Sequence, residues 1–467
     1  MSSTAAQAPR SLGLADVTLF MVTAGSSLQW TAVAAAAGPS SLIVWMLGGL
    51  GFFLPLAVCV VWLASRYPDE GGLYAWTGRA FGPFAGFMTG WTYWTGTLAF
   101  LPSVLYFCAG SARLLAVDSD ATSATPAWFI GFSVAALALA VTLNVRGMAV
   151  ARWLNSAGAV ARWLGTLLLV VLALASWWRF GPATAINART IVPEFRLADV
   201  IFWTTLAFCW TGPEAASYMG GEIREPRRTV PRALALAAPM IAAIYIVGTA
   251  SLLLAIPPQR ASGVYGVMEG IRAAAARLGL AWLIPLGAAC VVLDRIGSSC
   301  LWIGALARIP LAAGFDHHLP RSFTRLDARG SPVVAIWTQA IVVALLVIIG
   351  QSGTSVRGAY NVLIEMMVVT SMLPYLLLFA ATIRLARGAA AGGGLRVAGG
   401  RATLTALAVV GFATTAASLM LAFLPPPEES NPALAILKVG GLTAVLLGGG
   451  ALIYVIGSAR ARRAVRV

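Results

Sequence analysis

Charged side chains are scarce in this sequence. Asp, Glu, Lys and Arg make up 10% of the 467 residues, whereas a soluble domain carries roughly 25%. Hydrophobic residues reach 59%, and the mean hydropathy is +0.84. A chain of this length with so little charge cannot cover a surface that faces water. We therefore exclude a soluble globular protein and predict an all-α membrane protein in a lipid bilayer.

Residues that hold metals or carry out catalysis are also few. The five cysteines lie in apolar runs without the spacing of a disulfide framework or a zinc site, so we expect them to pack as small apolar groups. The two histidines, His317 and His318, are adjacent in a predicted cytoplasmic loop, and we expect a solvated connection there rather than a metal site. We see no arrangement of nucleophile and base, so we predict no enzyme, no metal and no cofactor.

Lysine is almost absent, because Lys438 is the only one among 32 basic residues. The formal net charge is +15, but the arginines are spread over many short loops rather than gathered in one patch. This distribution favours a topological signal and argues against a nucleic-acid partner.

Apolar runs of about 20 residues, which is the length that crosses a bilayer, recur along the whole chain. We predict about twelve transmembrane helices. They lie near residues 15–37, 41–65, 84–111, 127–145, 157–178, 200–220, 232–256, 281–309, 332–350, 361–385, 403–424 and 434–457.

The basic residues follow this topology. About 22 of the 32 lie on the side of the N-terminus, in loops or near the ends of spans, about 9 lie on the other side, and Arg295, midway along a span, is counted with neither. The positive-inside rule then puts both termini in the cytoplasm of a multi-pass protein of the cell inner membrane. We divide the chain into a cytoplasmic segment (1–14), two five-helix repeats (15–178 and 200–385), two additional helices (403–457) and a basic cytoplasmic tail (458–467).

Two spans are unsuited to a continuous helix. The first has small polar residues at mid-membrane, and the sixth combines a glycine, Pro213 and Glu214 in one turn. Each alone could be a packing seam or a proline kink. Together they occupy equivalent places in two inverted five-helix halves, which indicates the central substrate site of a transporter. The candidate binding residues are Thr23, Ala24, Gly25, Ser26, Ser27, Phe208, Cys209, Trp210, Thr211 and Gly212.

Three motifs resemble the amino acid–polyamine–organocation permeases. Residues 67–76 are similar to the family's P-E-x-G-G-x-Y loop, residues 208–214 to its F-x-F-x-G-x-E helix break, and residues 220–232 to its G-E-x-x-x-P-x-R-x-x-P-R loop. The resemblance implies a LeuT-like fold of two inverted five-helix repeats plus two C-terminal helices. The first break departs from the family's G-x-G-I-F pattern, so Gln29 and Trp30 are candidates for reshaping the pocket.

The resemblance also implies how the site is built. The substrate carboxylate and amine would bind the backbone of the broken helices, and Phe208 or Trp210 would form an aromatic wall or gate. Packing or lipid-facing aromatics are the alternative for these two. Glu214 would act in gating or proton handling, or else hold a helix end as a structural carboxylate.

Further gating or coupling candidates lie in the fifth and eighth spans. Ser298 and Ser299 are on a segment that lines a sodium site in sodium-coupled relatives. Arg162 lies where some sodium-independent relatives carry a lysine in place of the ion, and an arginine reaching to the interface is the alternative. Asp294 is a coupling or substrate-contacting group, or a partner in an ion pair with another helix. Since neighbouring residues point about 100° apart, we do not expect Asp294 and Arg295 to neutralise each other.

Together these features predict a secondary active transporter of amino acids that works by alternating access. The predicted cycle is independent of sodium, with proton symport or exchange against a second substrate. The alternatives are a carrier of amines, polyamines or other small organic cations, and a membrane sensor that binds substrate without transporting it.

Overall fold

The computed structural model describes residues 12–67, 72–115, 125–146, 148–194, 196–219, 223–261, 264–312, 318–351, 356–388, 395, 397–424 and 432–465. Nearly all secondary structure in these ranges is helical. The exception is one parallel β-bridge between Leu12 and Ile223, which ties the start of the first span to the segment after the sixth. The predicted all-α class is confirmed.

The first half of the chain supplies five spans and one short surface helix. The first span consists of α1 (Leu14–Gly25) and α2 (Leu28–Ala36), and the second of α3 (Ser41–Gly48), a π-helical turn (Gly49–Phe53) and α4 (Leu54–Arg66). The third, fourth and fifth spans are α6 (Pro83–Ala112), α7 (Pro126–Arg146) and α8 (Met148–Phe180). The surface helix α5 (Leu73–Phe81) precedes α6.

The second half repeats this plan and adds two helices. The sixth span is α9 (Leu197–Phe208) followed by η4 (Pro213–Met219), a run of 3-10 helix. Then come α10 (Pro226–Ala255), α12 (Leu283–Leu306), α14 (Val333–Gln351), α15 (Val356–Gly388), α16 (Gly400–Leu421) and α17 (Pro432–Val465). Three short pieces, α11 (Gly266–Arg277), α13 (Ile309–Ala312) and η7 (Arg321–Thr324), lie between spans.

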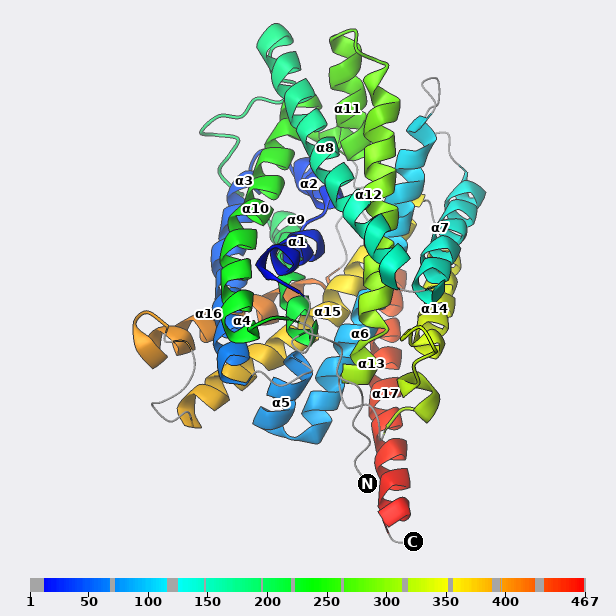
Figure 1. Cartoon of the computed structure of the whole chain (residues 1–467). Helices are drawn as coiled ribbons and strands as arrows, with labels where there is room; N and C mark the ends of the chain where they lie inside the picture. Colours follow the sequence, from blue (N-terminus) through cyan, green and yellow to red (C-terminus); the bar gives the residue numbers. More distant parts are fainter. Residues whose placement is uncertain are drawn as a thin grey trace.

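The expected count of about twelve spans is confirmed. Ten helical segments in the described ranges are each long and apolar enough to cross a membrane, counting α1 with α2 as one. The other two are α14, whose apolar part is the shorter stretch Val333–Ile349, and the interrupted α9 with η4. Figure 1 shows α11 at one end of the molecule and α5 at the opposite end.

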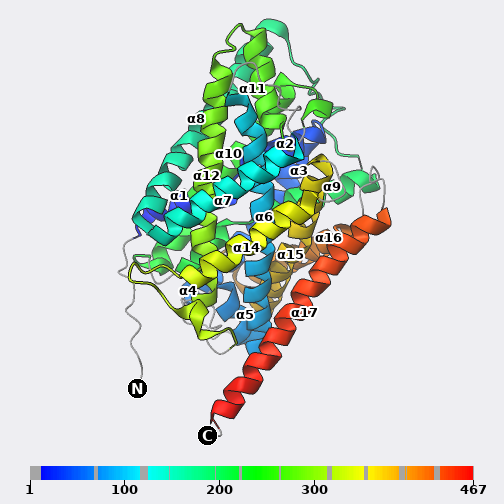
Figure 2. The same cartoon turned by 90° about the vertical axis from the view of Figure 1, so that its right-hand side faces the viewer.

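Both predicted helix interruptions are confirmed, and they lie near the middle of the bundle's length (Figure 1). The last two helices are peripheral, and Figure 2 shows α16 and α17 on one flank of the bundle. On this flank the indole Nε1 of Trp91, on α6, donates to the Leu446 carbonyl of α17 at 2.8 Å. The two added helices therefore cover the bundle without reaching its centre.

Close helix packing at glycines sets the geometry of the centre. A Cβ on Gly158 of α8 would lie 3.0 Å from the Leu293 carbonyl oxygen of α12, and one on Gly297 would lie 2.8 Å from the Leu154 carbonyl oxygen. Small residues let helix backbones approach in this way inside a membrane. Because residues four apart share a helix face, this crossing brings Arg162 against Asp294 and Ser298.

Candidate functional site

The interruption of the first span is two residues long. Ser26 (φ −133°, ψ 144°) and Ser27 (φ −151°, ψ 132°) are extended, so α1 ends at Gly25 and α2 begins at Leu28. Ser26 Oγ donates to the Val22 carbonyl at 2.6 Å. The first N–H groups of any helix have no intrahelical acceptor, and within the described part of the chain no side chain caps α2. The break therefore presents carbonyl oxygens from α1 and amide N–H groups from α2.

The interruption of the sixth span packs directly against the first. Gly212 has a φ of +120°, a backbone conformation that side chains rarely adopt. A Cβ at this position would also lie 2.4 Å from the Ala24 carbonyl oxygen, so only glycine fits. On the other side, a Cβ on Gly25 would lie 2.7 Å from Cγ of Pro213. The two breaks thus face each other at van der Waals distance.

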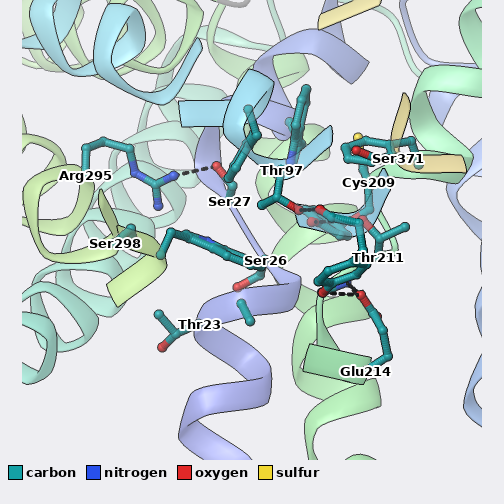
Figure 3. A pocket seen from close by; sticks show the side chains of 18 of the residues that line it. Thr23, Ser26, Ser27, Thr97, Cys209, Thr211, Glu214, Arg295, Ser298 and Ser371 are labelled. Atoms are coloured by element: carbon teal, nitrogen blue, oxygen red, sulfur yellow. Dashed lines mark hydrogen bonds between the residues drawn. The ribbon is translucent and has the colours of Figure 1, made fainter. Parts of the chain in front are cut away.

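A small cavity of about 40 Å³ lies between the breaks. This volume has room for only a few water molecules. Figure 3 shows the labelled side chains around it, which come from both interrupted spans and from α6, α12 and α15. Of the predicted site residues, those that line it are Thr23, Ala24, Ser26, Ser27, Arg162, Phe208, Cys209, Thr211, Gly212, Glu214 and Ser298.

Four of the predicted residues do not line this cavity. The Gly25 carbonyl accepts the Tyr245 hydroxyl, and the Asp294 carboxylate accepts from Arg162 and Arg295, which lie between it and the cavity. Ser299 Oγ donates to the Arg295 carbonyl at 2.8 Å. Trp210 points away from the cavity, into the second span. Its ring lies 5.1 Å from Phe53 and 5.9 Å from Trp45, centroid to centroid.

An aromatic layer covers the cavity on one side. Phe208 meets Trp30 of α2 edge to face at 6.1 Å, and Trp30 stacks on Phe100 of α6 at 6.2 Å. Phe100 in turn contacts Trp302 of α12 at 6.1 Å. The resemblance to permeases pointed to Phe208 and to a changed pocket at Trp30, whereas Phe100 and Trp302 were missed because no motif or pattern in the sequence marks them. Gln29 is fully buried and does not line the cavity.

Arg162 joins three helices beneath the first break. Its side chain is only 1% exposed, so the alternative of an arginine that reaches the membrane interface is wrong. Nη1 donates to the carbonyls of Thr23 at 2.9 Å and Ser26 at 2.8 Å. Nη2 donates to Ser298 Oγ at 2.8 Å, and Nε donates to Asp294 Oδ1 at 2.9 Å. The guanidinium therefore occupies the space that these four oxygens enclose.

Asp294 pairs with both neighbouring arginines. Arg162 approaches Oδ1, whereas Arg295 donates to Oδ2 through Nε at 3.0 Å and through Nη2. The expectation that residues 294 and 295 do not neutralise each other is therefore wrong. Their Cα–Cβ bonds diverge on the helix, but the long arginine side chain bends back to the carboxylate. Arg295 also donates from Nη1 to Ser27 Oγ at 2.7 Å and lines the cavity.

Glu214 closes the opposite side of the cavity. Its carboxylate accepts the Gly212 N–H, at 3.0 Å to Oε1 and 2.8 Å to Oε2. Oε1 also accepts the hydroxyls of Tyr93 on α6 at 3.1 Å and Tyr375 on α15 at 2.6 Å. The two helices approach closely at Gly96 of α6, where a Cβ would lie 2.8 Å from Oγ of Ser371 on α15. Glu214 thus ties η4 to two other spans.

A further tyrosine bridges the two breaks. The hydroxyl of Tyr245, on α10, lies 2.9 Å from the Gly25 carbonyl oxygen and 2.8 Å from the Cys209 carbonyl oxygen. Its ring stacks on Trp45 at 4.3 Å, which holds it in place. Tyr93, Tyr245 and Tyr375 were all missed, because a tyrosine in an apolar helix has no distinguishing pattern in a single sequence.

These features define a class of protein. Irregular backbone at membrane depth is tolerated only where protein or a cavity satisfies it. Here two interrupted spans at equivalent places of a helical bundle enclose a polar cavity, which is the arrangement of secondary transporters.

The comparison with known families is specific. The chain matches the amino acid permease family over residues 12–447, and it belongs to that family. It is therefore a multi-pass membrane transporter of the amino acid permease type rather than an enzyme.

Individual relatives agree with this. The chain is 26% identical to an uncharacterized transporter of Legionella pneumophila, covering 89% of this chain and 90% of that protein. It is 24% identical to a glutamate/gamma-aminobutyrate antiporter of Lactococcus lactis, covering 82% and 77%. It is also 24% identical to a probable agmatine/putrescine antiporter of the same species, covering 68% and 67%.

Among solved structures, the chain resembles that of MhsT in complex with L-phenylalanine. The TM-score is 0.58 at 14% identity, and the match covers 94% of this chain and 97% of that one. At this identity the likeness establishes the fold, which is LeuT-like as expected.

Proposed function

We propose that this permease moves amino acids across the cytoplasmic membrane by alternating access, without sodium. Residues 15–178 and 200–385 form the two inverted repeats that move against each other around the central cavity. The family assignment and the two facing breaks support this proposal. The first amide N–H groups of α2, which have no intrahelical acceptor, suit a substrate carboxylate. Its ammonium group would bind backbone carbonyls of the broken helices other than those that accept from Arg162.

The observation that carries sodium independence is the position of Arg162. Its guanidinium donates to two carbonyls of the first break, to Ser298 and to Asp294, all at 2.8–2.9 Å. These oxygens would otherwise suit a small cation. A sodium ion among them would meet a fixed positive charge that is tethered to α8, and the repulsion between like charges at such distances is large.

Two layers are suited to act as gates. The first is the aromatic layer of Trp30, Phe100, Phe208 and Trp302, and the second is the hydrogen-bonded Glu214. Along α6, which begins next to α5, Tyr93 at Glu214 comes before Phe100 of the aromatic layer, so Glu214 lies nearer the α5 end. Opening one layer while the other stays closed would expose the cavity to one side of the membrane at a time. Opening the Glu214 side requires the tyrosine hydroxyls to release the carboxylate.

The α5 end is proposed to face the cytoplasm, with both termini on that side. Arg79 of α5 lies over the Tyr67 ring at 4.8 Å, and Arg384 near the end of α15 lies over Phe81 at 5.3 Å. Arginines at this end agree with the excess of positive charge on the cytoplasmic side of membrane proteins.

Two modes of coupling remain as proposals, proton symport and exchange against a second substrate. The names of the two Lactococcus relatives, both antiporters, favour exchange. The agmatine/putrescine relative also supports an alternative function, a carrier of amines. A sensor that binds without transport is the remaining alternative.

Uptake by purified protein in liposomes tests this proposal. A panel of amino acids and amines is offered with an imposed sodium gradient, an imposed pH gradient, or unlabelled substrate inside. We expect amino-acid flux that is unchanged by sodium and stimulated by internal substrate or by the pH gradient. Flux that requires sodium would overturn the coupling proposal, and the absence of flux and exchange for every compound would overturn transport.

A further inference from the structure

Arg295 has donors that the protein leaves unused. A guanidinium carries five N–H groups, and Arg295 donates from Nε and Nη2 to Asp294 and from Nη1 to Ser27 Oγ. One N–H on each terminal nitrogen therefore has no acceptor among the residues that the structure describes. Two donors on neighbouring terminal nitrogens can serve the two oxygens of a carboxylate.

Arg162 differs in this respect, although it is equally buried and lines the same cavity. All five of its N–H groups are accounted for, since Nη1 and Nη2 each have two acceptors and Nε has one. Its charge holds helices together, whereas Arg295 can still accept a ligand.

The charges at this side of the cavity do not balance. Arg162 and Arg295 are each 1% exposed and share one carboxylate, that of Asp294. Glu214 lies on the other side of the cavity, as Figure 3 shows, and is held by its own N–H and tyrosine donors. A buried charge without a partner is costly. A ligand carboxylate at Arg295 would make the group neutral.

The first break also favours a negatively charged ligand beside Arg295. Ser27, which accepts from Arg295 at 2.7 Å, is the N-cap residue of the nine-residue α2. Arg295 therefore lies next to a helix N-terminus, where the partial positive charge favours anions. Two independent features, a side chain and a helix end, favour negative charge at one place and disfavour a cation there.

We propose that Arg295 is the anion subsite of the central cavity and binds the substrate's carboxylate, so that amines without a carboxylate are excluded. This inference rests on the proposed function, because it names the substrate group that the permease recognises. It selects amino acids over amines and polyamines, and it makes Arg295 a specificity-determining residue.

Direct binding to the purified full-length protein tests the subsite without requiring transport. Calorimetric titrations compare amino acids with their amides, which have nearly the same shape but no carboxylate, and with putrescine and agmatine. We expect each acid to bind about 10- to 100-fold more tightly than its amide, because hydrogen bonds to charged groups are lost. Equal affinity for acid and amide, tighter binding of the diamines, or no binding by any compound would overturn the proposal.

Variants assign the effect to Arg295. In Arg295→Gln the acid-to-amide ratio should fall close to one, and in Arg295→Lys, which keeps the charge but not the fork, it should be intermediate. The matched control is Arg277→Gln, which removes an exposed arginine from α11 and should leave the ratio unchanged. If Arg295→Gln does not fold, Arg295→Lys decides, and an unchanged ratio in that variant refutes the assignment.

The two proposals fail in different ways. If the protein binds acids over amides but shows no flux in liposomes, the subsite is supported and transport is not. If it transports amides or diamines as well as acids, transport is supported and the subsite is overturned.

Discussion

Replacing Arg162 tests the centre of this structure most severely. In Arg162→Gln the two carbonyls of the first break and Ser298 lose a charged donor, and Asp294 retains only Arg295. Removing one partner of a buried ion pair costs about 3–5 kcal/mol. If these contacts form only in the conformation in which the cavity is closed, the population of that conformation falls by roughly two to four powers of ten.

The measurement is exchange of labelled amino acid in liposomes, together with thermal unfolding of the purified protein in detergent. We expect exchange by Arg162→Gln to fall at least about 100-fold, with a lower unfolding temperature. Arg162→Lys should lie in between, because an ammonium keeps the charge but has three donors instead of five. Arg179→Gln, which removes an exposed arginine of the same helix, is the matched control.

Sodium gives a second readout on the same residue. Arg162→Ala leaves the carbonyl oxygens of Thr23 and Ser26, Ser298 Oγ and Asp294 Oδ1 without their guanidinium donor, while Asp294 Oδ2 keeps Arg295. Sodium should therefore raise the unfolding temperature of this variant but not that of the wild type. Exchange by Arg162→Gln within about threefold of the wild type would be a far smaller loss than the removal of one partner of a buried ion pair predicts, and it would refute the reasoning.

Three other substitutions probe the contacts between the breaks. Gly212→Ala places a Cβ 2.4 Å from the Ala24 carbonyl oxygen at a φ of +120°, so we expect loss of folded protein on size-exclusion chromatography. Tyr245→Phe leaves two buried carbonyls without their donor and should lower the unfolding temperature, at a cost of about 1–3 kcal/mol. Tyr375→Phe removes the 2.6 Å hydrogen bond to Glu214, and we expect faster opening on the α5 side, measured as quicker labelling of a cysteine introduced in the cavity. An unchanged labelling rate contradicts the gating role of that contact.

The sequence allowed the spans and the breaks to be predicted because they depend on local features. Run length and hydropathy define the spans, and the combination of Gly212, Pro213 and Glu214 in one turn indicates an interrupted helix. The short helices α5 and α11 were not predicted, because neither is long or apolar enough to resemble a span.

Side-chain partners from distant parts of the chain could not be predicted. Tyr93 and Tyr375 reach Glu214 across 121 and 161 residues of sequence. Trp210 was predicted to line the cavity together with Phe208. Because α9 ends at Phe208, helical periodicity no longer describes where residue 210 points, and its ring lies beside Trp45 instead.

The contact of Tyr245 with both breaks has a consequence for how they respond to a ligand. A phenolic hydroxyl has a single hydrogen, yet it lies within 2.9 Å of two carbonyl oxygens, those of Gly25 and Cys209. It can donate fully to only one of them at a time. The other carbonyl is then without the Tyr245 donor. Rotation of the O–H bond transfers the hydrogen bond between the Gly25 carbonyl of the first repeat and the Cys209 carbonyl of the second, so either break can be the one whose carbonyl is open to a ligand donor.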